Sequence, residues 1–152
     1  MTSSQNRGKK AEDSRELRHF SVKPIGVIHS SLKNRKDAPR FYTDKRAPKA
    51  VVELRPAYTK ALLRMKPGDE IVILTWLHRA HREVLRVHPQ RDLSNPLTGV
   101  FSTRSPDRPN PVGLHRVKVL KISGKRLHIG PIEAIDGTPV IDIKPVVEAQ
   151  DG

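Results

Sequence analysis

Glu70–Leu77 reads EIVILTWL, a continuous apolar run rich in β-branched residues, and this stretch decides the fold class. A run of this kind is typical of a central strand that is buried on both faces. Later in the chain, Val112–Ile122 (VGLHRVKVLKI) alternates apolar and polar residues, which predicts a half-buried strand. Ser123-Gly124-Lys125 then predicts a turn back into Arg126–Ile132, so these two segments form a hairpin.

Shorter segments on either side extend this pattern. Val22–Ile28 contains Pro24 and Gly26, which favours an edge strand or a bulge. Tyr58–Met65 has room for two helical turns before a Pro-Gly-Asp sequence ends them. Short strands joined by turns, with hardly any helix, predict an all-β sandwich or barrel. The remaining expected strands are Ala50–Leu54 and, after the Asp136-Gly137 turn, Pro139–Ile143; the two long loops are Asn34–Pro48 and Pro89–Pro111.

The length and composition limit the chain to one domain. It has 152 residues, of which 36% are hydrophobic, and we expect residues 1–20 to be a disordered polar tail and 21–148 to be the folded domain. The absence of cysteine excludes disulfides, thiol catalysis and cysteine-based zinc sites. The polar start resembles no secretory signal, and the longest apolar run is too short to span a bilayer, so we expect a cytoplasmic protein without membrane contact.

The net charge points to an anionic partner. Lys and Arg number 29 against 16 Asp and Glu, which gives +13, and a surplus of this size attracts nucleic acid or an anionic membrane surface. No amphipathic basic helix is visible, which disfavours the membrane. The basic residues concentrate in Lys33–Lys49 and in Arg104–Arg126, and we expect RNA to bind the loop Lys33–Lys49 and the strip Arg116–Arg126.

Several familiar sites are missing from the sequence. No G-x-G occurs, which excludes a Rossmann dinucleotide loop and a P-loop. His78, His81 and His88 lie close together in the chain, but the first two would point to opposite faces of a strand. A metal needs converging ligands, so we expect no metal site.

Gly99–Gly113 (GVFSTRSPDRPNPVG) is the segment with the most distinctive chemistry. Its prolines fix the backbone and leave carbonyl oxygens free. Arg104 and Arg108 add planar cations suited to carboxylate or phosphate, and Asn110 can both donate and accept hydrogen bonds. From composition alone, two interpretations stay open: a rigid loop that holds a zwitterion or nucleotide, or a structural turn with solvated arginines.

This loop resembles the signature of the TrmO/YaeB-type, or TsaA-like, family of S-adenosylmethionine-dependent tRNA methyltransferases. Pro24–Ser30 (PIGVIHS), Ala38–Arg40 (APR) and Asp136–Pro145 (DGTPVIDIKP) agree with the family in order and spacing. The resemblance covers roughly residues 22–146. It implies a small single-domain β-barrel, S-adenosyl-L-methionine bound between strands and loops, a homodimer, and N6-methylation of threonylcarbamoyladenosine next to the tRNA anticodon.

The resemblance also assigns residues. It implies contacts with the methyl donor at Phe41, Tyr42, Thr43, His78, Arg79, Arg104, Leu114, Pro131, Ile132, Glu133 and Ala134. We predict contacts with the methyl acceptor at Arg40, Arg108, Asn110, Lys118 and Lys121. Two of the methyl-donor contacts have structural alternatives, since Leu114 could belong to the core and Phe41 could anchor a loop. The general base is not identified, and the candidates are His78, Glu133, Asp136 and Asp142.

Two other functions stay open. The family's better-characterised members continue into a further C-terminal domain after the segment that matches Asp136–Pro145, and this sequence ends at Gly152. The same barrel could therefore methylate a small molecule, with an incidental basic surface. It could also be a non-catalytic module that binds RNA or the donor.

Overall fold

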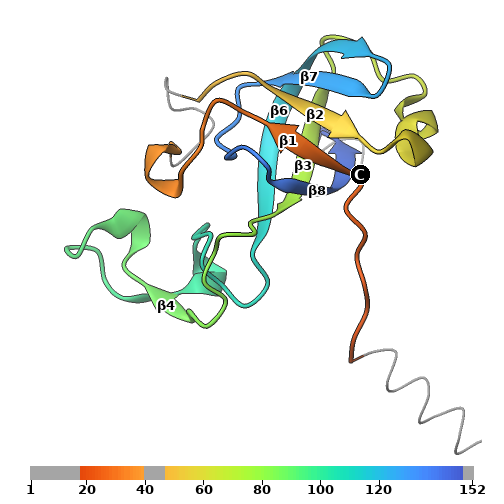
Figure 1. The fold of residues 1–152 in the computed structure, drawn as a ribbon. Helices are drawn as coiled ribbons and strands as arrows, with labels where there is room; N and C mark the ends of the chain where they lie inside the picture. The colour runs from red at the N-terminus through yellow and green to blue at the C-terminus, as the bar shows by residue number, and fades with distance from the viewer. Residues whose placement is uncertain (1–17, 40–46, 149–152) are drawn as a thin grey trace, which may run out of the picture.

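Six antiparallel strands close into a barrel in the computed structural model, which describes residues 18–39 and 47–148 (Figure 1). The strands follow each other around the barrel in the order β1-β2-β7-β6-β3-β8, and β8 pairs with β1 to close it. Their bounds are β1 Gly26–His29, β2 Ala50–Leu54, β3 Glu70–Trp76, β6 Val112–Ser123, β7 Arg126–Gly130 and β8 Pro139–Pro145. The all-β prediction is confirmed, and the barrel alternative is the observed one.

The alternation of β6 sets the inside and the outside of the barrel. Val117 and Val119 are buried, whereas Arg116 and Lys118 between them are exposed, as the sequence pattern predicts. β3 alternates as well, with Ile71 and Ile73 buried and Val72 and Leu74 half-buried. The prediction that this strand is buried on both faces is therefore wrong. A closed barrel has one interior, and the outer face of β3 is only partly covered.

β1 is not an edge strand, which corrects another expectation. It pairs with β2 on one side and with β8 on the other, because the closed sheet leaves no edge there. Pro24 precedes the strand, so its missing N–H removes no bond from the ladder. Gly26 is needed where the strands approach: a Cβ there would lie 2.5 Å from the carbonyl oxygen of Glu53 on β2.

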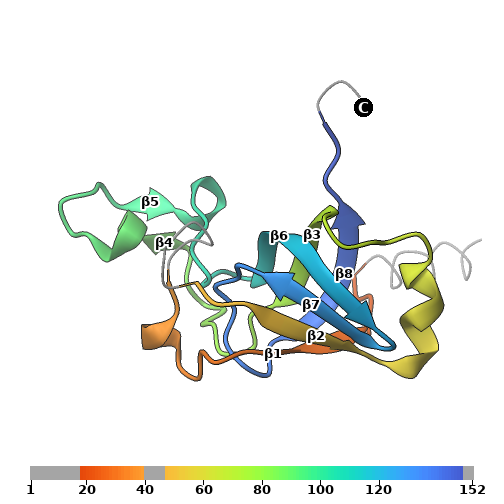
Figure 2. The ribbon, with the colours of Figure 1, turned by 90° about the horizontal axis from the view of Figure 1, so that it is seen from above.

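Short helical turns and a two-stranded ribbon lie outside the barrel. The ribbon pairs β4 (Arg86–Val87) with β5 (Thr98–Gly99), and both views show it projecting away from the barrel (Figures 1 and 2). The helical turns expected at Tyr58–Met65 occur as a 3₁₀ helix, η2, which begins two residues and ends three residues earlier than expected. The 3₁₀ helices are η1 Arg35–Asp37, η2 Pro56–Leu62, η3 Pro89–Arg91 and η4 Val100–Ser102.

The segment between β7 and β8 passes the ends of β2 and β1 and is fixed there by main-chain hydrogen bonds. Ile132 N–H donates to the carbonyl of Pro48 at 2.9 Å, and Asp136 N–H donates to that of Leu32 at 2.6 Å. Ile132 and Ala134 are buried in the core. The predicted strand Arg126–Ile132 therefore ends at Gly130, because the chain turns from β7 toward β8.

The predicted turns occur where expected. Gly124 joins β6 to β7 with a φ of 58°, and Gly137 precedes β8 with a φ of 82°, both in the left-handed region that glycine tolerates. Within residues 18–39 and 47–148, no helix is long and apolar enough to cross a membrane.

Candidate functional site

The carboxylate of Asp107 connects the loop Gly99–Gly113, which we call the signature loop, to two other segments. Its Oδ1 accepts a hydrogen bond from Arg35 Nη2 at 2.9 Å and another from the His81 N–H at 2.8 Å. Burial acts to raise the pKa of Asp107, but these hydrogen bonds outweigh it and hold the pKa below its usual value. The ionised carboxylate thus fixes the loop against η1 and the turn that follows β3.

The two arginines of the signature loop have different roles. Arg108 donates to the carbonyls of Val100, Thr103 and Ser105 at 2.9, 3.1 and 3.0 Å, so its guanidinium holds the loop in shape. Arg104 is exposed and has no hydrogen bond or ion pair within the described residues. The structure therefore leaves one arginine, Arg104, free to bind an anionic group, and uses the other internally.

Asn110 also has a partner within the protein. Its side-chain oxygen accepts a hydrogen bond from Arg82 Nη2 at 3.0 Å, while Arg82 Nε donates to the carbonyl of Pro109 at 2.7 Å. The same guanidinium lies 5.1 Å from the centre of the Trp76 ring, at the end of β3. Arg82 thus connects the signature loop to the barrel.

A chain of three polar side chains occupies the buried side of β3 and β6. The Glu133 Oε1 accepts a hydrogen bond from His115 Nδ1 at 2.6 Å, and His115 Nε2 lies 2.7 Å from Thr75 Oγ1. Since a carboxylate only accepts, Nδ1 carries a proton, and a neutral ring then accepts the hydroxyl proton of Thr75 at Nε2. Thr75 is 0% exposed, so its hydroxyl cannot attack a substrate as a hydrolase serine would.

Glu133 has an acceptor that the protein does not use. Its Oε2 is buried and has no hydrogen-bond partner among the described residues, although Oε1 is held by His115. A buried carboxylate oxygen without a donor is costly, so such an atom is a marker of a site that a ligand completes. The residue lies in the segment that crosses from β7 to β8.

Gly113, the last residue of the signature loop, provides the space for this chain of side chains. A Cβ at this position would collide with Thr75 Oγ1 and would lie 2.7 Å from His115 Nε2. Gly113 pairs directly with Thr75 across β3 and β6. The glycine of the signature loop and the Thr75–His115–Glu133 chain therefore depend on each other.

His78 and Arg79 lie in a turn after β3, which ends at Trp76. The expectation that His78 and His81 face opposite sides of a strand is therefore wrong. Burial lowers the pKa of His78 below its usual value, and the charge of Arg79 lowers it further. Arg79 Nη1 donates to the carbonyl of Lys33 at 3.0 Å. No cluster of three metal-ligating side chains occurs in residues 18–39 or 47–148.

The other predicted donor contacts lie on two surfaces. Leu114 is 50% exposed on the outer face of β6, so the alternative that places it in the core is wrong. Ile132 and Ala134 are buried, so only their main chain can meet a ligand without rearrangement, whereas Pro131 is exposed. Arg40, Phe41, Tyr42 and Thr43 lie outside the described residues.

Among the predicted contacts with the methyl acceptor and the candidate bases, the lysines are exposed and the two aspartates are paired with other groups. Lys118 and Lys121 are exposed on β6. Asp136 accepts the Ser30 N–H at 3.0 Å and lies 3.1 Å from Lys33 Nζ, and these two contacts hold its pKa below the usual value. A carboxylate stabilised in this way is a weaker base. Asp142 pairs with Lys144 at 3.4 Å.

The sequence interpretation missed His115 and Thr75, although the alternation pattern contains them. His115 shares the inward face of β6 with Val117 and Val119, and Thr75 shares that of β3 with Ile73. A polar residue at an inward position must find a partner. Such an inconsistency in the pattern is the signal that would have identified both residues.

Comparison with known proteins shows to which family this chain belongs. The family model described as the tRNA-methyltransferase O N-terminal domain matches residues 27–152. The chain belongs to the TrmO N-terminal domain family. The family resemblance read from the signature loop is thereby confirmed.

Two relatives and one solved structure illustrate the family. The chain is 42% identical over 125 residues to the S-adenosyl-L-methionine-binding protein of Archaeoglobus fulgidus, covering 81% of this chain and 86% of that protein. It is 38% identical over 136 residues to a Methanocaldococcus jannaschii protein named "Probable S-adenosyl-L-methionine-binding protein MJ1583", covering 87% and 96%. The crystal structure of TrmO from Pseudomonas aeruginosa superposes with a TM-score of 0.71 at 33% identity.

The fraction of each relative that this chain matches differs between TrmO and the archaeal proteins. The matched region covers 90% of this chain but 60% of the crystallised TrmO chain. The similarity therefore concerns the barrel domain of TrmO, whereas the archaeal relatives match over nearly their whole length.

The division of roles between the loop arginines can be tested through folding stability. Arg108→Ala should lower the free energy of unfolding by about 2–3 kcal/mol, because three carbonyls lose a charged donor. Arg104→Ala serves as the matched control and should change it by less than about 0.5 kcal/mol, as expected for an exposed, unpaired side chain. Urea unfolding measures both variants, and equal stability losses would contradict the assignment.

Proposed function

We propose that this chain binds S-adenosyl-L-methionine and catalyses transfer of its methyl group to RNA, at N6 of threonylcarbamoyladenosine next to the tRNA anticodon. Support comes from membership of the tRNA-methyltransferase O family and from the binding activity in the relatives' names. The structural observation that carries the proposal is the unused acceptor of Glu133, held by His115 within a segment implicated by the family resemblance.

The residues of this site suit the chemistry of the donor. S-adenosylmethionine presents a sulfonium cation, N–H and O–H groups and a carboxylate, and when bound it supplies an electrophilic methyl group. On a protein of net charge +13, the cation needs a local negative group, which Glu133 provides. Arg104, which has no partner among the described residues, suits the carboxylate.

The acceptor nitrogen must lose a proton during methylation, and the residues differ in their capacity to accept it. Burial holds the pKa of His78 below its ordinary value, so the ring is neutral at pH 7 and can accept a proton. The hydrogen bonds from Ser30 and Lys33 make Asp136 the weaker choice. We therefore favour His78 over Asp136 as the base. Glu133 then serves as a contact for the methyl donor.

Affinities for the methyl donor should distinguish the role of Glu133 from that of Arg104. Glu133→Gln should weaken the binding of S-adenosylmethionine by about tenfold or more, since a charged hydrogen bond contributes about 1.5–3 kcal/mol. It should weaken S-adenosylhomocysteine less, because that ligand lacks the sulfonium charge. Arg104→Ala should weaken both ligands equally, because both carry the carboxylate. Calorimetry without added metal measures these affinities, and no binding of either ligand to the unsubstituted protein would refute the proposal.

The acceptor is tested by transfer of a labelled methyl group. We expect label in cellular tRNA that carries threonylcarbamoyladenosine and none in the same tRNA transcribed without modification. A panel of small metabolites is the parallel arm. Label in a metabolite but not in tRNA would establish the small-molecule alternative, and donor binding without transfer to any acceptor would indicate a non-catalytic module.

A homodimer is also part of the proposal, and exposed apolar side chains support it. Val112 and Leu114 share the outer face of β6 and are 40% and 50% exposed. Apolar side chains that gather on one surface often mark an interface. Light scattering should give twice the 17.1 kDa mass of the chain, and Leu114→Glu should shift the protein to the monomer. A monomer before substitution would exclude the dimer.

A further inference from the structure

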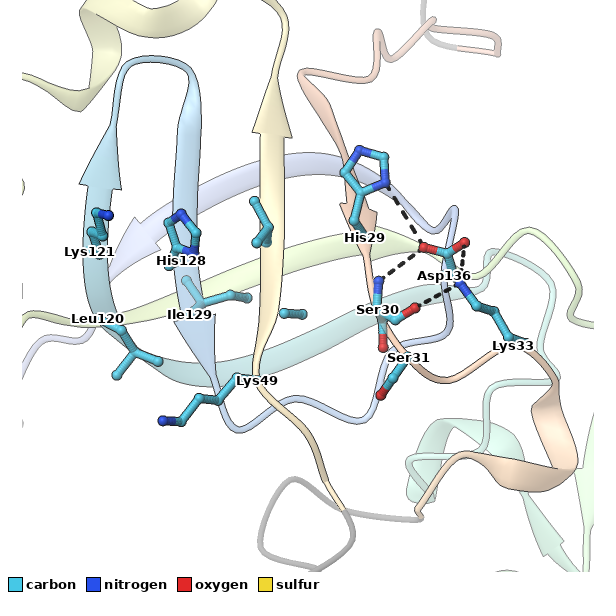
Figure 3. A pocket seen from close by; sticks show the side chains of 12 residues that line it. His29, Ser30, Ser31, Lys33, Lys49, Leu120, Lys121, His128, Ile129 and Asp136 are labelled. Carbon is cyan, nitrogen blue, oxygen red and sulfur yellow. Dashed lines mark hydrogen bonds and ion pairs between the residues drawn. The ribbon is translucent and has the colours of Figure 1, made fainter.

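The outer surface of the barrel carries an open depression that the donor chemistry does not use. It has a volume of about 630 Å³ and crosses four neighbouring strands, β1, β2, β7 and β6 (Figure 3). The strand registers align one row of residues along it: His29 opposite Val51, Val51 opposite His128, and His128 opposite Lys121. We call this depression the cross-strand groove.

The charges along the cross-strand groove are balanced at one end only. At the β1 end, His29 lies 2.7 Å from Glu53, and Lys33 lies 3.1 Å from Asp136. At the β6 end, Lys49, Lys121 and His128 have no hydrogen bond or ion pair within the described residues. The β6 end therefore presents two unpaired ammonium groups, and the β1 end is close to neutral.

The position of Lys49 directs its charge toward the same end. Its Cγ would lie 3.0 Å from a Cβ at Gly130, so the side chain lies over the end of β7, and Gly130 leaves room for it. Figure 3 shows it extending from the start of β2 toward Leu120 on β6. Leu120 is 39% exposed and adds an apolar surface beside the two cations.

We propose that the cross-strand groove binds the phosphodiester backbone of an RNA strand, with Lys49 and Lys121 contacting phosphates and Leu120 contacting a sugar or base. An exposed ammonium is a point charge suited to phosphate. Neighbouring strands lie about 4.8 Å apart, so the row of four strands spans roughly 14 Å, more than a single phosphate group needs. The groove is open rather than enclosing, which favours a passing chain over a small anion.

This inference rests on the proposed RNA acceptor and adds a location to it. The groove is separate from Glu133 and Arg104, because neither residue lines it. Substitutions in the groove should therefore change the affinity for RNA and leave the affinity for the donor unchanged. That separation makes the groove testable independently of the methyl-transfer site.

The test compares two double variants that remove the same charge. Lys49→Gln with Lys121→Gln changes the groove, and Lys60→Gln with Arg64→Gln changes exposed positions on or just after η2, which follows the opposite end of β2. Affinity for cellular tRNA is measured between about 50 and 200 mM salt, where each lost phosphate contact lowers the salt slope by about 1. The groove variant should therefore bind about tenfold less tightly per lysine at about 0.1 M salt.

The control variant should bind within about threefold of the unsubstituted protein, and both variants should bind S-adenosylmethionine normally by calorimetry. Equal losses in the two double variants would show that only net charge matters and would overturn the groove. A loss of donor affinity in the groove variant would assign the lysines to the donor instead. If the unsubstituted protein binds the donor but no tRNA, the RNA acceptor itself is refuted, and the groove proposal with it.

Discussion

Two polar side chains face the inside of a small barrel, and the hydrogen bond that satisfies them organises the site. His115 is 4% exposed and Thr75 is fully buried, so each needs a partner within the protein. They bind each other at 2.7 Å, and Glu133 completes the chain at 2.6 Å. Because Glu133 belongs to the segment between β7 and β8, this chain ties that segment to β3 and β6 and fixes the direction of its carboxylate.

The charged side chains of the signature loop have separate roles. Its most prominent cations, Arg104 and Arg108, look equivalent in sequence, yet Arg108 is bound to three carbonyls of the loop while Arg104 has no partner among the described residues. Asp107 in turn fixes the loop to Arg35 and to the turn at His81. A rigid loop with one free cation is better prepared for a ligand than a loop with two mobile ones, because less conformational entropy is lost on binding.

The sequence predicted the strands and turns well because these depend on local patterns. The alternation in Val112–Ile122 and the Asp-Gly turn before β8 require only neighbouring residues, and both were found in place. The errors arose where closure of the barrel decides. β1 became an inner member of the sheet, and β3 gained a partly exposed face, because pairing between distant strands cannot be read from either segment alone.

The candidate site follows the same division. Motif resemblance indicated Glu133 and Arg104, but only the fold shows that Arg108 is committed to the loop and that Leu114 is exposed. The sequence pattern could have identified His115, as a polar residue at an inward position of an alternating strand. It could not have identified Glu133 as the partner, because Glu133 lies 18 residues further along the chain.

The distribution of charge links the two surfaces of the barrel. A net charge of +13 favours polyanions from every direction, yet attraction alone does not orient a bound molecule. Acids neutralise the basic groups at the β1 end of the cross-strand groove, whereas those at the β6 end have no partner among the described residues. Since β6 also carries His115 on its buried side, one strand joins the unpaired lysine surface to the carboxylate chain. An RNA held across the groove would contact the same strand that holds Glu133, which is a physical route from nonspecific attraction to a defined geometry.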